Sequence, residues 1–401
     1  MGADADAAGV VIVGASVGGL HAAEQLRAQG FTGAITLVGA EPHLPYDRPP
    51  LSKQLLLGIH HRDDVMFRTR AELAELHVRL CLGCPAVRWD GQRLTLADGS
   101  TLGAGRLIVA TGVLPRTLPG QPWHPAIGTL RTLDDAEWLA ARLRRGGTVA
   151  VIGGGFIGAE VASAARALGN DVVMFEATDL PMQGVLGADA GAIMAEVLTG
   201  AGVDYRGGTL VGALVPDGEK VLVGPSGAGV NQLRADTVVV GIGSVPQSGW
   251  LGVEGPDGVR CDEHGHALGF ARTYAIGDVA AWPDSRTGRA RRSEHWTSTR
   301  HQAAVVAADI AGAEPPPPEP PYFWTDQFGL KIQVVGRPDL ADRTVIIRPE
   351  EGGVKKSVVL YLANDRLVGV ALFSAARHLG RFTGLIGAGA DEASALAGLT
   401  S

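Results

Sequence analysis

Cysteine is scarce in this chain, with three residues among 401, too few for the disulfide framework of a small secreted protein. Two of the three, Cys81 and Cys84, form a CxxC pair. A redox-active pair needs its attacking thiol at a helix N-terminus or beside a cation, which lowers the thiol pKa. This pair instead lies in HVRLCLGCPAV, a strand-like segment with Pro85 directly after the second thiol. We predict two free structural thiols, and because neither a second CxxC nor a histidine cluster is present, no metal site.

An excess of positive charge and long apolar runs are lacking too. The net charge is -7, which argues against nucleic acid as the main partner. The longest apolar runs are strand-sized, well below the roughly 20 residues of a membrane-spanning helix. The start, MGADADAAG, has neither the basic nor the apolar region of a signal peptide. We therefore expect a cytoplasmic protein that does not act at a membrane.

Glycine, in contrast, is abundant, with 57 residues, and the hydrophobic content is 46%. This composition is typical of an alanine-rich α/β protein, and the length predicts about two or three domains. Residues 149–177, VAVIGGGFIGAEVASAARALGNDVVMFEA, predict a strand, a glycine turn, a helix and a second strand. The turn matches the GxGxxG fingerprint, in which glycines allow the tight turn, the approach to a pyrophosphate and close helix packing. The predicted NAD-binding residues of this turn are Gly153, Gly155, Phe156, Ile157 and Gly158.

Glu176, at the end of the second strand, determines the expected coenzyme. A carboxylate there can bind a ribose 2′-hydroxyl and repels a 2′-phosphate. No basic residue follows before Arg206, so we predict NADH rather than NADPH. A later strand at 236–240 runs into GIGSVP, whose Gly243 is consistent with the close of the same domain.

A second unit of this kind lies near the N-terminus. A strand at 10–13 leads into GASVGG, a helix runs to about residue 29, and a strand at 35–38 ends near Glu41. A serine replaces the middle glycine, which weakens the motif. Two such units together predict an enzyme that binds two dinucleotides; the residues of this turn are Gly14, Ala15, Ser16, Gly18 and Gly19.

Two further strand ends fit a nucleotide. LIVATG ends in Ala110, Thr111 and Gly112, small residues that let backbone approach a bound molecule. In TYAIGDV, Asp278 follows Gly277 and could accept hydrogen bonds from the ribityl hydroxyls of a flavin, or merely cap a helix.

Proline marks two other segments. PYDRPPLSK places Arg48 and Lys53 before a short helix that Ser52 could cap, although a surface turn with solvated cations is an alternative. EPPPPEPP, residues 314–321, predicts a semi-rigid polyproline linker. After it, strands are expected at 330–335, 344–347 and 358–362, with hairpin turns at 352–353 and 364–365.

The motifs VIVGASVGGLHAAEQLR, LPYDRPPLSK, ATGVLPRTLPG, LRTLDDA, VIGGGFIGAEVA, GIGSVP, YAIGDVAAW, EHW and PYFWTDQFGLKIQVVG resemble the oxygenase-coupled NADH-dependent ferredoxin reductases. This resemblance covers nearly the whole chain. It implies a glutathione-reductase-like α/β fold with two Rossmann-type dinucleotide-binding domains, for FAD and NAD, plus a C-terminal α+β domain. The implied bounds are 1–114 and 240–316 for the FAD-binding domain, 115–239 for the NAD-binding domain, and 319–401 for the C-terminal domain.

The resemblance also implies roles for single residues around FAD. It assigns the diphosphate to Gly14, Ser16 and Gly19, the adenosine ribose to Glu41, and the adenine to the backbone near Ala86. The residues that it places on the flavin side are Arg48, Lys53, Arg131, Asp278, Trp296 and Trp324. Both tryptophans could equally be core or interface residues.

Lys53 and Glu160 are the two residues for which the resemblance implies a catalytic role. A cation at a helix start is not favoured by the helix dipole, which suggests that Lys53 is kept there for another reason. The resemblance puts both side chains beside N5 of the flavin, where we predict an ion pair. One departure from the family is Gln183, which stands in a loop where an arginine is common; NADH binding would then be weaker, or another arginine would substitute.

The sequence thus predicts a flavoprotein that passes electrons singly from NADH to a 2Fe-2S ferredoxin serving an oxygenase, as a monomer or weak dimer. A flavin disulfide reductase or NADH oxidase is one alternative, and a flavin-bound signalling protein is another. Ferredoxins of this type are usually acidic. We expect a basic docking surface at Arg286, Arg289, Arg291 and Arg292, for which an arginine-rich solvated hairpin is the alternative.

Overall fold

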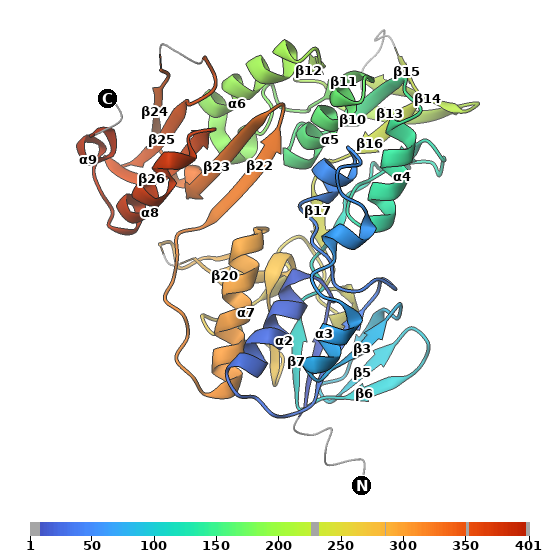
Figure 1. The fold of residues 1–401 in the computed structure, drawn as a ribbon, viewed down its shortest axis with the longest axis vertical. Helices are drawn as coiled ribbons and strands as arrows, with labels where there is room; N and C mark the ends of the chain where they lie inside the picture. The colour runs from blue at the N-terminus through green and yellow to red at the C-terminus, as the bar shows by residue number, and fades with distance from the viewer. Residues whose placement is uncertain (1–8, 226–231, 285, 350–352, 398–401) are drawn as a thin grey trace. The chain divides into compact units, whose positions relative to one another are not determined.

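The computed structural model describes residues 9–225, 232–284, 286–349 and 353–397 (Figure 1). The chain divides into two compact units. The first unit comprises Met1–Asp47, Asp63–Leu114 and Ser244–Pro318, and the second comprises Arg48–Arg62, Pro115–Gly243 and Glu319–Ser401.

The first unit is built on a parallel five-stranded sheet with the order β19-β7-β1-β2-β3. All four residues of β1 are buried, as expected for a parallel strand covered on both faces. The strands are β1 (Val10–Val13), β2 (Ile35–Gly39), β3 (Val78–Leu82), β7 (Arg106–Val109) and β19 (Thr273–Ala275).

Helices α2 (Val17–Ala28) and α7 (Trp296–Ala311) pack against each other on this sheet, as Figure 1 shows. Small buried residues of both helices, among them Ala22, Ala23, Ala303 and Ala307, belong to one hydrophobic core that also includes Val10 and Ile12 of β1. Alanine at these positions lets the two helix backbones approach closely. The start of α7 is therefore held near the glycine turn that precedes α2.

The second unit contains a parallel sheet with the order β12-β11-β10-β16-β9. Its strands are β9 (Ile127–Gly128), β10 (Thr148–Ile152), β11 (Asp171–Phe175), β12 (Asp204–Arg206) and β16 (Thr237–Val240). The helices of this part are α4 (Leu133–Leu143), α5 (Phe156–Ala167) and α6 (Gln183–Gly200). The strand, turn, helix and strand predicted for residues 149–176 are thus confirmed, as are those predicted for residues 10–38.

The second unit also contains an antiparallel sheet with the order β22-β23-β26-β25-β24. Its strands are β22 (Tyr322–Gln327), β23 (Leu330–Gly336), β24 (Arg343–Ile347), β25 (Val358–Ala363) and β26 (Arg366–Phe373), and α8 (Leu379–Gly387) and α9 (Glu392–Leu396) follow. Alternate residues of β25 enter different cores: Leu360 packs with Phe382 of α8, while Tyr361 packs with residues of α5 and α6. Burial on both faces ties this sheet to α5.

Asn364 and Asp365, the predicted hairpin turn, both have positive φ angles of 50° and 60° and join β25 to β26. Two consecutive residues in the left-handed region match the twist of the strands that they connect. The other predicted turn, at 352–353, includes Gly352, which lies outside the described residues.

The remaining elements are short. They are α3 (Arg70–Glu75), β4 (Ala86–Trp89), β5 (Arg93–Leu96), β6 (Thr101–Gly103), β8 (Val113–Pro115), β13 (Val211–Asp217), β14 (Lys220–Pro225), β15 (Leu233–Ala235), β17 (Ser244–Pro246), β18 (Val259–Arg260), β20 (Ala280–Pro283), β21 (Ala290–Arg292), a π-helical turn at Leu51–Leu55, and 3-10 turns at Arg62–Val65, Gly249–Leu251, Gly277–Val279, Pro338–Leu340 and Ala376–His378.

Two local predictions are wrong. Ser52 does not cap a helix, because the turn at Leu51–Leu55 already begins at Pro50, whose helical φ of −69° starts it early, and leaves Ser52 inside it. Gln183 does not lie in a loop, since it is the first residue of α6. Its side-chain Oε1 accepts a hydrogen bond from the Leu180 N–H at 3.3 Å.

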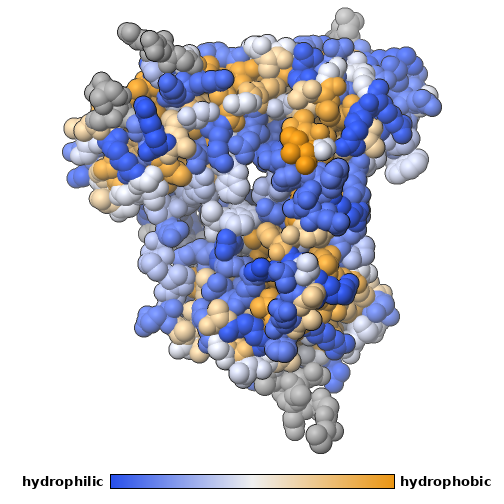
Figure 2. Space-filling model, in the orientation of Figure 1, coloured by the Kyte–Doolittle hydropathy of each residue, from blue (hydrophilic) through white to orange (hydrophobic). Residues whose placement is uncertain are grey.

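Hydrophilic side chains predominate on the face of the molecule shown in Figure 2, and hydrophobic ones lie between them in small groups. Among the described residues, the helices are all too short or too polar to cross a membrane.

The CxxC pair lies where the sequence predicts, with Cys81 on β3 and Cys84 just after it, and both thiols are free. Burial, with a smaller contribution from Cys84, raises the pKa of the Cys81 thiol. A redox-active thiol requires the opposite shift. The environment of the pair therefore favours a structural role.

We expect the double variant Cys81→Ser and Cys84→Ser to keep the flavin and the rate of NADH-dependent electron transfer that the family resemblance implies. In the native chain, Cys81 should react with iodoacetamide at neutral pH more slowly than free cysteine, because less of it is thiolate. Loss of electron transfer in a variant that retains its flavin would support the disulfide-reductase alternative instead.

Candidate functional site

The turn between β1 and α2 has room for backbone only. Gly14 has a φ of +122°, and a Cβ built on it would lie 2.1 Å from the carbonyl oxygen of Ala110, at the end of β7. A Cβ on Gly19 would lie 1.9 Å from the carbonyl oxygen of Gly14. Glycine is therefore required at both positions. These contacts bring Gly14, Ala110 and Thr111 together at the carboxyl edge of the sheet, where open α/β sheets bind ligands.

The turn between β10 and α5 repeats this geometry in the second unit. Gly153 has a φ of +107°, and its Cβ would lie 2.2 Å from the carbonyl oxygen of Gly241, while a Cβ on Gly158 would lie 2.0 Å from the carbonyl oxygen of Gly153. A Cβ on Gly155 or Gly243 would meet nothing within 4 Å. The fold thus needs glycine at 153 and 158 and leaves open space at 155.

The N-termini of α2 and α5 differ from those of α3 and α4. Thr69 and Thr132 close full capping boxes on α3 and α4. Ser16 of α2 makes no side-chain cap and Gly155 of α5 can make none, and the first turns of these two described helices contain no acid. Such helix ends suit an anion, because their N–H groups and the helix dipole favour negative charge. Both sites therefore fit the diphosphate of a dinucleotide.

Further predicted residues of the first unit are fixed by hydrogen bonds around this edge. The Thr111 hydroxyl donates to the carbonyl oxygen of Gln247 at 2.7 Å, and the N–H of Gln247 donates to the carbonyl oxygen of Gly112 at 2.9 Å. Glu41, two residues after β2, accepts a hydrogen bond from the Tyr46 hydroxyl at 2.6 Å. Ala86 begins β4 and is half-buried.

Asp278 lies inside the 3-10 turn Gly277–Val279 and does not cap it, since the N-cap residue is Ile276. The N–H of Gly277 donates to the side-chain Oε1 of Gln302, on α7, at 2.7 Å. The Arg292 guanidinium donates to the carbonyl oxygen of Asp278 at 2.8 Å. Asp278 therefore lies on a turn whose backbone is hydrogen-bonded to Gln302 of α7 and to Arg292 of β21.

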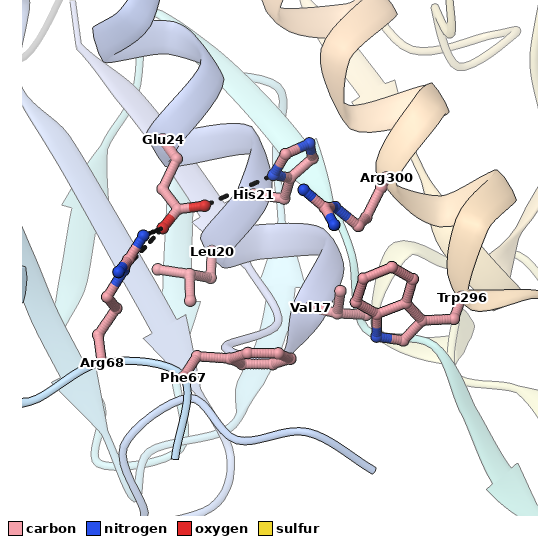
Figure 3. Close-up of a pocket in the computed structure, with 8 residues that line it drawn as sticks. All are labelled: Val17, Leu20, His21, Glu24, Phe67, Arg68, Trp296 and Arg300. Atoms are coloured by element: carbon pink, nitrogen blue, oxygen red, sulfur yellow. Dashed lines mark hydrogen bonds and ion pairs between the residues drawn. The ribbon is translucent and has the colours of Figure 1, made fainter. Parts of the chain in front are cut away.

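Trp296, the first residue of α7, lines a pocket of about 260 Å³ together with residues of α2 and the segment before α3 (Figure 3). Its indole Nε1 donates to Asp47 Oδ1 at 3.0 Å, and the Arg300 guanidinium lies 4.7 Å from its ring centroid. The ring is therefore fixed by a hydrogen bond and a cation–π contact. The residues that line the pocket are Val17, Leu20, His21, Glu24, Phe67, Arg68, Trp296 and Arg300.

His295 directly precedes Trp296, and its imidazole is uncharged at pH 7. Burial, aided by the nearby Arg291, lowers the pKa of this imidazole to about 4. Trp324, the second predicted tryptophan, lies on β22 in the other unit and stacks on Tyr322, with ring centroids 5.9 Å apart.

Glu176 is the first residue after β11, and its side chain lies beside the second glycine turn. Its carboxylate accepts hydrogen bonds from the N–H groups of Gly154 and Thr178. Arg206, which the sequence separates by a long stretch, lies on the neighbouring strand β12, in register with Phe175. Its guanidinium lies over the Phe175 ring and is ion-paired with Asp204 at 2.7 Å. Arg206, which the sequence analysis treated as too distant to matter, thus stands near the end of β11.

Lys53 and Glu160 form the predicted ion pair, with Nζ and Oε2 separated by 2.9 Å. Nζ also donates to the carbonyl oxygen of Pro49 at 2.8 Å. Glu160 is only 4% exposed, and it accepts two further hydrogen bonds, from the hydroxyls of Ser52 and Thr325. Sequence reasoning gave neither hydroxyl this role.

Arg48 and Arg131 also come together, because the Arg48 guanidinium donates to the carbonyl oxygen of Arg131. The N–H of Arg131 donates to Asp135 at 2.9 Å, in the first turn of α4. This arrangement fixes the backbone before α4.

Comparisons with known protein families and sequences show which proteins this chain is similar to. Residues 8–307 match the pyridine nucleotide-disulphide oxidoreductase family, and residues 322–398 match a family described as reductase C-terminal. The chain is 37% identical over 383 residues to the ferredoxin–NAD⁺ reductase component of the p-cumate 2,3-dioxygenase system of Pseudomonas putida, covering 93% of this chain and 92% of the relative. It is 36% identical to rhodocoxin reductase of Rhodococcus erythropolis, covering 90% of this chain and 85% of the relative.

Among solved structures, a chain of the covalent putidaredoxin reductase–putidaredoxin complex superimposes with a TM-score of 0.88. The two sequences are 30% identical, and the match covers 95% of this chain and 93% of that chain. These likenesses confirm the resemblance inferred from the sequence and the α/β fold that it implies.

Replacing Glu176 with Ala should narrow the preference for NADH over NADPH, by about tenfold for each 1.4 kcal/mol of lost discrimination. The carboxylate that we expect to repel a 2′-phosphate would be gone, while Arg206 would remain. The measurement is kcat/KM with each coenzyme. Glu196→Ala, which removes an exposed acid paired with Arg348, is the matched control. Equal efficiency with both coenzymes in the native chain would contradict the role of Glu176.

Proposed function

Because this chain belongs to the pyridine nucleotide-disulphide oxidoreductase family, we propose that it is an FAD-dependent enzyme that takes hydride from NADH and reduces a 2Fe-2S ferredoxin serving an oxygenase. The likeness of almost the whole chain to ferredoxin–NAD⁺ reductase components carries this proposal. In it, residues 1–114 and 240–316 bind FAD, residues 115–239 bind NADH, and residues 319–401 form the C-terminal domain.

The two uncapped helix starts support the binding of two dinucleotides. In the proposed enzyme, the turn before α2 holds the FAD diphosphate and the turn before α5 holds that of NADH, with Glu176 on the adenosine ribose. Bound FAD would supply the chemistry that links a two-electron donor to a one-electron acceptor. The chain's own part is to bind, orient and provide charge, and we propose that Lys53 holds its positive charge near the flavin.

A disulfide reductase is the nearest alternative, and the thiols argue against it. The three cysteines are free, and burial raises the pKa of Cys81 and raises that of Cys261 to about 12. Thiols with raised pKa values are poor nucleophiles at neutral pH.

The proposal is tested by mixing the FAD-loaded chain with NADH and cytochrome c. Rapid reduction of cytochrome c should require an added 2Fe-2S ferredoxin, and a panel of ferredoxins from the same genome would identify the partner. Ferricyanide, a small acceptor, reports the NADH-dependent half of the reaction alone. Rapid reduction of oxygen or of a disulfide without any ferredoxin would exclude the proposed function.

The hairpin of β20 and β21 is the proposed docking surface for an acidic partner. Arg286, Arg289 and Arg291 are exposed. Arg292 is less so, because it is paired with Glu294 at 2.7 Å and bound to the Asp278 carbonyl. The hairpin therefore presents three exposed arginines to solvent. The fourth, Arg292, connects the hairpin to the turn that contains Asp278, the proposed ribityl-binding residue.

Reversing two of these charges, Arg289→Glu with Arg291→Glu, should slow ferredoxin reduction at low salt by about tenfold or more, because electrostatic steering is lost. The rate of NADH-to-ferricyanide transfer should stay the same. The control is Arg88→Glu with Arg93→Glu, exposed arginines of β4 and β5, which changes the net charge equally. Unchanged ferredoxin kinetics, or an equal effect in the control, would remove the hairpin as a docking surface.

A further inference from the structure

Strand β22, from the C-terminal part of the chain, lies directly against α5, the helix that follows the second glycine turn. Alternate residues of a strand share one face, and helix residues spaced by three or four also share one face. Three contacts join these faces: the rings of Phe323 and Phe156 are 5.2 Å apart, the Thr325 hydroxyl donates to Glu160, and the N–H of Phe328, just after the strand, donates to Ser163 at 2.7 Å.

Glu160 lies at the middle of this contact and is almost completely buried. Its Oε2 accepts hydrogen bonds from Lys53 and Ser52, whereas its Oε1 accepts one from Thr325 at 2.6 Å. A buried carboxylate needs donors on both oxygens, because each unmet acceptor keeps its full desolvation penalty. Thr325, itself 1% exposed, is the donor that the described residues offer to Oε1.

The direction of the Thr325 hydroxyl is also determined. The side-chain amide of Gln327 donates to Thr325 Oγ1 at 3.1 Å, so the hydroxyl accepts from Gln327 and its own proton is left for Glu160. The same amide lies 3.9 Å from the sulfur of Met182, whose N–H donates to the carbonyl oxygen of Gly154 at 3.0 Å. The strand is therefore connected both to Glu160 and to the glycine turn.

We propose that Thr325 is a positioning residue of the hydride-transfer site: it orients the Glu160 carboxylate and, through it, Lys53. This inference rests on the proposed function, because it takes Lys53 and Glu160 to act beside the flavin. It gives the C-terminal domain a part in the chemistry of the NADH half-reaction, in addition to any contact with a ferredoxin.

Two substitutions at this position separate orientation from packing. Thr325→Val keeps the shape and removes the hydroxyl, whereas Thr325→Ser keeps the hydroxyl and removes a methyl group. Stopped-flow reduction of the FAD-loaded chain by NADH, without ferredoxin, should be about tenfold slower at saturation in Thr325→Val, because a hydrogen bond to a charged group is lost. Thr325→Ser should retain a rate near that of the native chain, and the Kd for NADH should change little in both.

A role in packing alone predicts the reverse order, with Thr325→Ser the more impaired variant, and that result would overturn the inference. A normal reduction rate in Thr325→Val would overturn it as well. Lys53→Met provides the reference, since it should show the same slow reduction and a lowered flavin midpoint potential. Failure of the proposed ferredoxin partnership would leave these measurements unaffected, because no ferredoxin is present.

A second readout does not depend on activity. Thermal unfolding of the FAD-loaded native chain, Thr325→Val, Glu160→Ala and the double variant forms a double-mutant cycle. If Thr325 acts through the carboxylate, the loss of melting temperature caused by Thr325→Val should be much smaller when Glu160 is also replaced by alanine, which removes the acceptor of the Thr325 hydroxyl. Additive losses would show that the two side chains are not coupled and would contradict the proposal.

Discussion

The close approach of backbone to backbone at two glycine turns is the constraint on which the rest of this structure depends. In each unit, the glycine that follows the central strand lies very close to the end of an adjacent strand of the sheet. A Cβ on Gly14 would lie 2.1 Å from the carbonyl oxygen of Ala110, and a Cβ on Gly153 would lie 2.2 Å from that of Gly241. Because this approach fixes where the following helix begins, it also fixes where the N–H groups of α2 and α5 converge. The same steric requirement thus produces two helix starts in one chain that suit an anion.

The N-termini of α2 and α5 differ from those of α3 and α4. Thr69 and Thr132 complete capping boxes on α3 and α4, whereas Ser16 and Gly155 provide no side-chain cap for α2 and α5. Replacing a capping side chain with alanine typically costs about 1 kcal/mol, whereas glycine at the N-cap costs only about a few tenths of that. Because the described helices α6, α7 and α8 also lack a side-chain cap, an anion is indicated at α2 and α5 by the combination of an open helix start with the glycine turn before it.

The features that could be predicted from the sequence are local. Strand, turn and helix around Gly14 and Gly153 follow from residues within one short stretch, and so does the hairpin at Asn364 and Asp365. Contacts across the chain could not be predicted in this way. Arg206 reaches the end of β11 only through strand register, and the serine assigned to a helix cap donates instead to a carboxylate 108 residues away. The Lys53–Glu160 pair was found only because a family resemblance supplied the long-range information.

That pair shows why the C-terminal part of the chain matters to the site. Bringing a lysine and a glutamate out of water carries a desolvation penalty that their attraction offsets only when the remaining hydrogen-bonding positions are also satisfied. Lys53 and Glu160 are 11% and 4% exposed, so their neighbours must provide those partners. Pro49 accepts from the lysine, and Ser52 and Thr325 donate to the carboxylate. A buried pair of this kind is weak evidence for stability, since apolar residues would fill the space at least as well. Its presence is better explained by a need for fixed charge at this place, and the strand that carries Thr325 is then part of what keeps that charge in position.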